Sequence, residues 1–272
     1  MWIKKNEIIK LSDDIRRIVD GRDIDLRDNR EGVFSILKND IHTLANLKNE
    51  QVDALRHDRD ALKDTLANIS HQLKTPLTSM CLMADLLETA QSEKQGAFIA
   101  NIRTGLTRME WLVSALLKLA KLDAGAVTFA GDRIDASELI GLALEPLQIL
   151  LDVKNQTVVT IGEAEVFCDK HWTAEAISNI IKNASEHSPA GGEITVKSGE
   201  NPICSWIAVT DSGKGISPSE TARLFKRFEG SRSEKGYGVG LPLALAIMRG
   251  QNGDIQVDSG SGGATFMLKF YH

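Results

Sequence analysis

The stretch NISHQLKTPLTS (residues 68–79) places a proline five residues after a histidine, within the apolar spacing of a long helix. Apolar residues recur at a seven-residue spacing, at Leu55, Leu62 and Ile69. This repeat predicts the core stripe of a coiled coil or helical bundle. On such a helix His71 lies about 200° from Ile69 and is expected on the exposed face, with Thr75 one turn further along. A neutral imidazole in that position is a nucleophile that can accept a phosphoryl group.

Pro76 is an unusual residue for a helix interior. It has no N–H to bond the carbonyl of Gln72, and its ring crowds that carbonyl, at a cost of about 3 kcal/mol. Because this weak point lies beside His71, we interpret it as a place where the helix can bend. Bending would let His71 meet more than one partner surface.

A second apolar stripe follows the polar segment QSEKQG (91–96). Its residues are Phe98, Ile102, Leu106, Met109, Leu112, Val113, Leu116, Leu117 and Leu119. Two amphipathic helices joined by a short polar segment predict a helical hairpin. Since each helix leaves an apolar face without cover, we expect two copies of the chain to associate as a homodimeric four-helix bundle.

Residues 1–50 are expected to form two helices around a charged connector, RDIDLRDNR (22–30). This order is typical of a parallel coiled-coil signal-relay module, and a pair of ordinary docking helices is the alternative. The chain opens MWIKK, an aromatic residue followed by lysines, as is found at the cytoplasmic end of a membrane span. We therefore expect the cytoplasmic portion of a membrane protein with a sensor segment upstream; a basic terminus without a membrane role is the alternative.

The composition limits the classes of protein to consider. Hydrophobic residues make up 42% and charged residues 25% of the chain, as in an ordinary globular protein. The formal net charge of −5 argues against binding to nucleic acid phosphates. The three cysteines, Cys81, Cys168 and Cys204, have no CxxC spacing, so we expect buried thiols rather than disulfides or a zinc site. No apolar run reaches the roughly 18 residues that span a bilayer.

Residues 126–272 change to a mixed pattern of short strands and helices. Strands rich in Val, Ile and aromatic residues are expected at 157–161, 165–168, 193–197, 203–209, 254–258 and 264–270. Helices are expected at about 137–151, 171–187, 217–227 and 240–250. The pattern predicts an α+β sandwich of sheet against helices. The predicted domains are therefore the relay helices 1–50, the coiled-coil linker and hairpin 51–125, and the α+β domain 126–272.

Polar residues interrupt the expected core face of the helix at 171–187. Asn179 and Asn183 lie one turn apart between buried apolar positions, and His187 extends the same row. An amide oxygen is a hard, neutral ligand that suits a Mg²⁺ ion bridging phosphates. Asparagines on a wet helix face are the alternative.

The loops after the predicted strands carry further polar and glycine residues. Asp211, at the end of a strand, could accept a hydrogen bond from an exocyclic amine, and Gly213 and Gly215 would let the backbone approach a flat ring. The glycines of GYGVGL (236–241) lead into a helix start, which is a favourable site for an anion. They follow a polar loop rather than a strand and no GxxxxGK[ST] run exists, so neither a dinucleotide fold nor a P-loop is indicated.

Together these motifs resemble the cytoplasmic part of bacterial two-component sensor histidine kinases. The resemblance covers about residues 58–272, in the family's order and spacing. Its motifs are ISHQLKTPL for the phosphoacceptor box, NIIKNASEHS for the N box, DSGKGI for the first glycine box, LFKRF for the F box, GYGVGL for the second glycine box and GGATF for the closing strand. Residues 1–50 resemble a HAMP relay more loosely, through REG (30–32) and the flanking helix pattern.

The resemblance implies a dimerisation and histidine-phosphotransfer bundle joined to a GHKL (Bergerat-type) ATP-binding domain. It implies that Mg-ATP phosphorylates His71, that Thr75 supports a phosphatase activity, and that the phosphoryl group passes to an aspartate of a response regulator. It further implies that Asn183 is the Mg²⁺ ligand and that Asp211 contacts adenine. The nucleotide-binding residues implied are Asn179, Asn183, His187, Asp211, Gly213, Gly215, Gly236, Gly238, Gly240 and Leu241.

Two positions depart from the family pattern. Gln72 stands where an acidic residue usually follows the histidine, and an amide can orient His71 but cannot take its proton. A general base contributes about 10²–10⁴-fold, so autophosphorylation is expected to be slower or to use another base. Glu186 stands where the N box usually has a basic residue, which leaves Lys182, Arg232 and Lys235 as candidates to neutralise phosphate charge.

Two other functions remain open at this point. One is an ATP-hydrolysing clamp of the gyrase type, which would need a catalytic glutamate and a transducer domain after the ATP site. The other is a pseudokinase that holds ATP and mainly dephosphorylates or sequesters its regulator, with which Gln72 and Glu186 are compatible.

Overall fold

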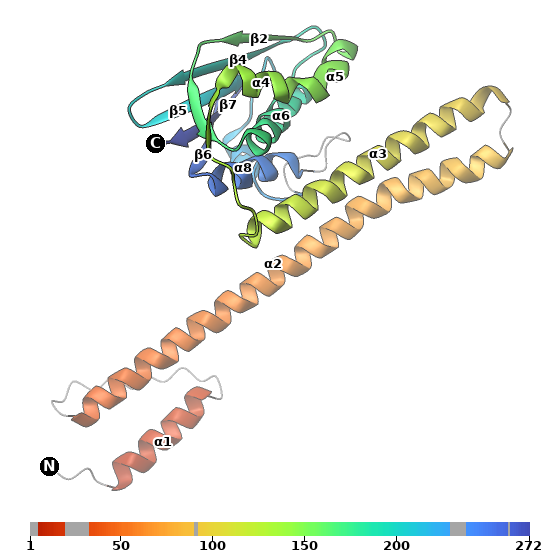
Figure 1. Ribbon diagram of the computed structural model, residues 1–272. Coiled ribbons are helices and arrows are strands. Elements are labelled where there is room, and N and C mark those ends of the chain that lie inside the picture. Colours follow the sequence, from red (N-terminus) through yellow and green to blue (C-terminus); the bar gives the residue numbers. More distant parts are fainter. Residues whose placement is uncertain (1–4, 20–32, 90–91, 229–237, 261) are drawn as a thin grey trace. The chain divides into compact units, whose positions relative to one another are not determined.

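The computed structural model describes residues 5–19, 33–89, 92–228, 238–260 and 262–272 (Figure 1). The chain divides into two compact units, Met1–Ile69 and Ser70–His272. The connector 22–30, the REG motif, Gly236, Arg232 and Lys235 lie outside the described residues, so the predictions for them stay predictions.

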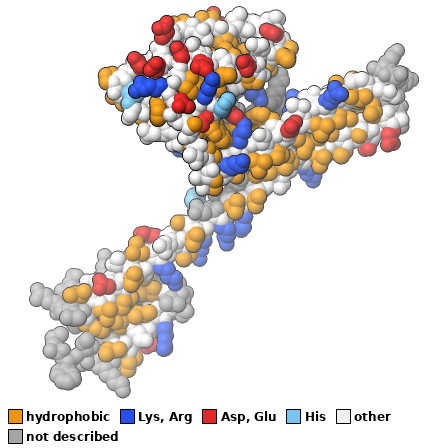
Figure 2. Space-filling model, viewed as in Figure 1, with side chains coloured by type: hydrophobic (Ala, Val, Ile, Leu, Met, Phe, Trp, Pro, Cys, Tyr) orange, Lys and Arg blue, Asp and Glu red, His pale blue; other side chains and the backbone are white. Residues whose placement is uncertain are grey.

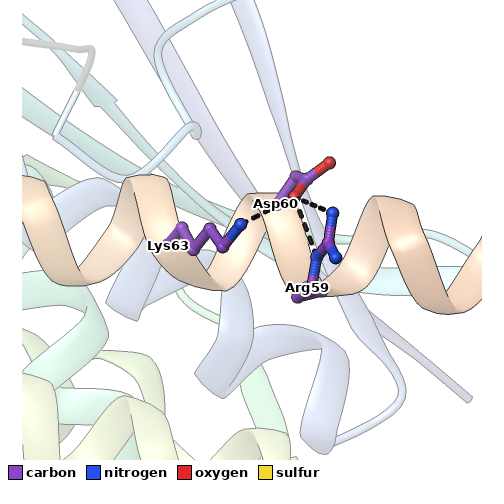
Figure 3. A network of polar contacts seen from close by, with 3 residues as sticks. All are labelled: Arg59, Asp60 and Lys63. Atoms are coloured by element: carbon purple, nitrogen blue, oxygen red, sulfur yellow. Dashed lines mark hydrogen bonds and ion pairs between the residues drawn. The ribbon is translucent and has the colours of Figure 1, made fainter.

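The first unit contains helix α1 (Lys5–Val19) and the first part of helix α2 (Val33–Thr89). The predicted heptad residues Leu55 and Leu62 on α2 are 67% and 59% exposed. On the same stretch Asp60 accepts hydrogen bonds from the guanidinium of Arg59, at 2.9 and 3.1 Å, and lies 3.6 Å from the ammonium of Lys63 (Figure 3). Among the described helices, none is both long enough and apolar enough to cross a bilayer.

The second unit begins with the remainder of α2 and helix α3 (Ser92–Asp123), which form the predicted hairpin. Helix α2 continues through Pro76. The prediction that 91–96 is the connecting segment is wrong for most of its length, because α3 already starts at Ser92. The residues at 93–95 (Glu, Lys and Gln) are good helix formers. Gly96 destabilises the helix by only about 1 kcal/mol relative to alanine, so the helix can include it. A Cβ on Gly105 would lie 2.7 Å from the Met80 side chain, so this glycine gives the methionine room.

The rest of the second unit is the predicted α+β sandwich, which is confirmed together with the hairpin. Its main sheet has the order β2-β4-β5-β7-β6, in which β2 and β4 are parallel and the other pairs antiparallel. The strands are β2 (Thr157–Ile161), β4 (Glu193–Glu200), β5 (Cys204–Thr210), β6 (Gly253–Gly260) and β7 (Gly263–Tyr271). A small antiparallel sheet pairs β1 (Asp132–Asp135) with β3 (Glu165–Cys168). Strand β1 escaped prediction because its sequence DRID has one buried apolar residue and no alternation.

Three helices cover one face of the main sheet (Figure 1): α4 (Ala136–Leu144), α6 (Lys170–His187) and α8 (Gly240–Gly250). The core between the helices and the sheet contains Ile177, Ile180, Ile181, Ile207 and Phe266, all fully buried. This packing fixes the rotation of α6 about its axis, which decides where its polar residues point.

Two predicted helices differ from the structure. The helix expected at 137–151 is divided into α4, a 3-10 turn at Glu145–Leu147 and α5 (Gln148–Val153), because Pro146 lacks an N–H to continue α4. The helix expected at 217–227 is only α7 (Pro218–Thr221), followed by turns to Phe228. Phe228 adopts a positive φ of 65° and donates its N–H to the carbonyl of Gly238 at 3.0 Å, so the chain leaves helical geometry there.

The cysteines differ in exposure. Cys168 and Cys204 are buried as predicted, whereas the prediction is wrong for Cys81, which is exposed on α2. Its neighbour Met80 is buried, and one step along a helix turns the next side chain by about 100°. Burial raises the pKa of the Cys168 thiol, because the thiolate would lose its solvation.

Candidate functional site

His71 lies on the exposed side of α2, as the helical spacing predicts. Thr75, one turn further on, is also exposed, and its hydroxyl donates a hydrogen bond to the backbone carbonyl of His71 at 3.2 Å. Gln72 is half-buried beside them. Within the described part of the chain, neither ring nitrogen of His71 has a hydrogen-bond partner, so the imidazole is open to a reacting group.

Helix α6 begins at a well-bonded cap. The carboxylate of Asp169 accepts hydrogen bonds from the backbone N–H groups of His171 and Trp172, both at 3.1 Å, and of Ala130 at 2.9 Å. The bonds from His171 and Trp172 satisfy donors that a helix start leaves without partners, and the bond from Ala130 ties the cap to the segment before β1. The cap and the buried apolar face together hold the row of polar residues on α6 in one orientation.

The two asparagines of that row are half-buried on α6. The side-chain N–H of Asn179 donates to the carbonyl of Glu175 at 3.0 Å, which orients its oxygen Oδ1 away from that bond. A Cβ on Gly240 would lie 3.0 Å from this oxygen, so α8 can start this close to Asn179 because residue 240 is glycine. Asn183 follows one turn later on the same helix, toward the exposed His187.

Asp211 directly follows β5 and is 5% exposed. Its oxygen Oδ1 accepts hydrogen bonds from the N–H groups of Gly213 at 2.8 Å and Ala264 at 3.2 Å. Within the described residues its second oxygen, Oδ2, has no hydrogen-bond partner, although it is not a fully buried atom. One carboxylate oxygen therefore fixes the loop while the other is free to bind a donor.

The glycines near Asp211 allow backbone segments to approach each other closely. A Cβ on Gly213 would lie 2.8 Å from the carbonyl oxygen of His187. Gly215 has a φ of +78°, and a Cβ there would lie 2.0 Å from the carbonyl oxygen of Gly260. In the structure both glycines lie close to neighbouring backbone, and their approach to a flat ring stays a prediction.

The second glycine motif is described from Gly238 onward. Gly238 has a φ of +65°, and a Cβ on it would lie 3.1 Å from the Cα of Phe228. Val239 is fully buried, and Leu241, in the first turn of α8, is 8% exposed. The pairing of Phe228 with Gly238 was missed by sequence reasoning, since no pattern signals a positive φ at a phenylalanine.

The structure brings two pairs of the predicted nucleotide residues close to each other. Asn179 meets Gly240 at the start of α8, and His187 meets Gly213 in the loop of Asp211. His71, Gln72 and Thr75 lie apart on the hairpin, and no hydrogen bond or ion pair recorded for the described ranges joins them to this cluster.

Contacts between α3 and the α+β domain were not predicted. Lys118 pairs with Glu175, and Arg227 donates two hydrogen bonds to the carboxylate of Asp123, at 2.7 and 2.8 Å. Lys182 was one of three candidates to neutralise phosphate charge, and its ammonium lies 4.5 Å from the centre of the Trp111 ring.

Two parts of the chain match known families. Residues 61–125 match the His Kinase A (phospho-acceptor) domain, and residues 168–271 match the histidine kinase-, DNA gyrase B- and HSP90-like ATPase family.

Among the described residues no group of three or more His, Cys, Asp or Glu side chains is placed to hold a metal ion.

The chain is similar to several curated proteins. It is 31% identical over 215 residues to heme sensor protein HssS of Staphylococcus saprophyticus, covering 78% of this chain and 47% of that protein. It is 29% identical over 215 residues to sensor histidine kinase WalK of Bacillus subtilis, covering 75% of this chain and 35% of that one. The chain therefore spans about half or less of the length of these relatives.

Solved structures share the fold. The histidine kinase AdeS of Acinetobacter baumannii aligns with a TM-score of 0.64 at 20% identity, over 74% of this chain and 97% of that one. The histidine kinase ThkA, solved in complex with the response regulator protein TrrA, aligns with a TM-score of 0.65 at 19% identity, over 82% of this chain and 66% of that one. With the phospho-acceptor domain and the ATPase-like domain in succession, the chain belongs to the sensor histidine kinase family.

Proposed function

We propose that this chain catalyses transfer of the γ-phosphoryl group of ATP to His71, and then from His71 to an aspartate of a response regulator. The observation that carries the proposal is the exposed His71 imidazole, whose ring nitrogens have no partner among the described residues, in a chain with an ATPase-like domain. The match of residues 61–125 to a phospho-acceptor domain supports it.

In the first step a lone pair on a ring nitrogen of His71 attacks the γ-phosphorus. A nitrogen–phosphorus bond forms, the bond from phosphorus to the bridging oxygen breaks, and ADP leaves with the electron pair. The proton on the other ring nitrogen passes to solvent or to a base. Gln72 cannot be that base, because an amide has no site that is basic at neutral pH.

In the nucleotide site the free oxygen of Asp211 would accept a hydrogen bond from the exocyclic amine of adenine. Asn183, with Asn179 beside it, would hold Mg²⁺ through an amide oxygen. The residues fit this ion, because Mg²⁺ in nucleotide sites takes few protein ligands and completes its shell with water and phosphate oxygens. When bound, Mg²⁺ neutralises charge on the phosphates.

A phosphatase activity toward the phosphorylated regulator is a second candidate. Its support is Thr75, whose exposed hydroxyl lies on the same helix face as His71. A relative from Mycolicibacterium smegmatis, 28% identical over 222 residues, carries the name histidine-protein kinase/phosphatase MprB. A homodimer of the hairpin, the domain limits at 50 and 125, and a membrane-linked location remain predictions.

The test is incubation of the purified chain with γ-labelled ATP and Mg²⁺. We expect acid-labile label on the wild type and none on His71→Ala. His57→Ala is a matched control, because His57 is also exposed on α2, and it should label normally. Gln72→Glu should label faster, since a carboxylate can take the imidazole proton.

Two results would decide against His71 as the phosphorylated residue. ATP binding without label, or label retained in His71→Ala, would contradict phosphorylation of His71.

The phosphatase activity is tested at Thr75. Thr75→Ala should keep its label but dephosphorylate a phosphorylated regulator more slowly. Equal dephosphorylation rates in the wild type and Thr75→Ala would mean that Thr75 does not support the phosphatase activity.

A further inference from the structure

Gln156 is a buried polar residue outside every motif that points to the nucleotide site. It lies between α5 and β2 and is 7% exposed. Its side-chain N–H₂ donates to the carbonyl oxygens of Ser185 at 3.1 Å, Ser188 at 3.2 Å and Pro189 at 3.0 Å. Its oxygen Oε1 accepts a hydrogen bond from the hydroxyl of Ser185 at 2.6 Å. The amide therefore uses both its donor and its acceptor side on one short segment.

That segment is the end of α6 and the turn after it. The last carbonyls of a helix have no partners within the helix, and buried carbonyls without partners are costly. Backbone bonds tie the same turn to the Gln156 region, from Gly191 N–H to the carbonyl of Lys154 at 2.9 Å and from Thr157 N–H to the carbonyl of Gly192 at 3.2 Å. Residues 185–192 are thus fixed against the start of β2.

The other side of this segment touches the loop of Asp211. The hydroxyl of Ser188 accepts a hydrogen bond from the N–H of Ser212 at 3.2 Å. The carbonyl of His187 lies against Gly213, where a Cβ would approach it to 2.8 Å. Gly213 in turn donates its N–H to Asp211 at 2.8 Å. A displacement of residues 187–188 must therefore move the loop that holds the Asp211 carboxylate.

We propose that Gln156 is a positioning residue of the nucleotide site, which sets the place of the Asp211 carboxylate by fixing the end of α6. The inference rests on the proposed function, since it assumes that Asp211 recognises adenine. A residue that only capped α6 would affect the stability of the domain but not its choice of base. Base selectivity is therefore the property to measure.

The experiment compares ATP with inosine triphosphate, which has a carbonyl oxygen in place of the exocyclic amine. Dissociation constants for both nucleotides are measured on the full chain with Mg²⁺. The variants are Gln156→Leu, which removes every bond of the amide at similar volume, and Gln148→Leu as a control at an exposed position of α5. We expect Gln156→Leu to lower the preference for ATP over inosine triphosphate by about tenfold. Gln148→Leu should leave the preference unchanged.

A second arm tests whether Gln156 acts through Asp211. In an Asp211→Asn background, Gln156→Leu should change the ratio of the two dissociation constants no further, because coupled residues give non-additive effects. An unchanged ratio in folded Gln156→Leu, or a full and additive loss in the Asp211→Asn background, would overturn the proposal.

A second variant, Ser188→Ala, tests the proposal if Gln156→Leu does not fold. If circular dichroism shows that Gln156→Leu does not fold, Ser188→Ala removes the link to Ser212, and the ratio should then fall about threefold. An unaltered ratio in Ser188→Ala would overturn the proposal. If the wild type binds no ATP, the proposed function fails as well; if it binds ATP and labels His71 while the ratio is unaltered, the positioning role alone fails.

Discussion

In the α+β domain the large apolar side chains of Ile177, Ile180 and Phe266 are fully buried, whereas on the hairpin Leu106 and Leu117 are 55% and 60% exposed. Figure 2 shows hydrophobic side chains gathered on the visible face of the long helices. The exposed hairpin residues follow the same apolar period that predicts a buried stripe. The α+β domain buries its core within the chain, together with Leu112, Ala115 and Leu119 of α3, and the hairpin leaves part of its apolar stripe uncovered.

The difference indicates how each part is stabilised. Burial of apolar surface stabilises a fold by about 25 cal/mol per Å², so we expect the domain that buries its core within one chain to need no partner for its stability. Leu106, Met109, Val113 and Leu117 form an apolar stripe on the surface of α3, beside Glu110, Ser114, Lys118 and Lys121. A second copy of the chain is the occupant expected for such a stripe, and the stability of the hairpin should then depend on protein concentration.

The largest expected effect is on the closed core. Phe266→Ala should reduce the free energy of unfolding of the α+β domain by about 4 kcal/mol, because it loses the buried ring and leaves a cavity. Urea unfolding followed by tryptophan fluorescence measures this loss, and ATP binding should fall with it. A loss below about 1 kcal/mol would mean that the core adapts to the cavity and that the contrast with the hairpin is overstated.

A smaller effect is expected at the hairpin, and it should appear in association rather than in folding of the α+β domain. Leu117→Glu should raise the dimer dissociation constant at least about tenfold, because a carboxylate would be buried without a partner. Sedimentation equilibrium measures the constant. The control is Ile149→Glu, at a residue that is 80% exposed on α5. Equal constants for wild type and Leu117→Glu would place the dimer contact elsewhere.

The sequence predicted the local features of the site but not its long-range contacts. The 3.6-residue period placed His71 on an exposed face and Asn179 and Asn183 on one side of α6, because local repeats decide which side of a helix is buried. It did not predict the pairing of Phe228 with Gly238 or the bonds of Gln156, since both depend on segments far apart in the chain. The helix expected at 217–227 ends at Thr221, and the bond of Phe228 to Gly238, distant in the sequence, could not be predicted either.

The smallest expected effects concern ion pairs, and they sharpen the comparison because similar pairs occur in different surroundings. Lys118 and Glu175 join α3 to α6 with side chains 34% and 30% exposed, whereas Asp60 among Arg59 and Lys63 is 58% exposed. Exposed pairs are solvated and screened, so Asp60→Ala should change the free energy of unfolding by no more than about 0.5 kcal/mol. A double-mutant cycle on Lys118 and Glu175 should give a coupling free energy of about 1 kcal/mol. Added salt at roughly 0.5 M should weaken this coupling less than it weakens an exposed pair, because partly buried charges are screened less. A coupling no larger than the effect of Asp60→Ala would mean that the contact between α3 and α6 is as open to solvent as a free helix surface. The hairpin and the α+β domain would then be held together by apolar packing at Leu112, Ala115 and Leu119 rather than by charge.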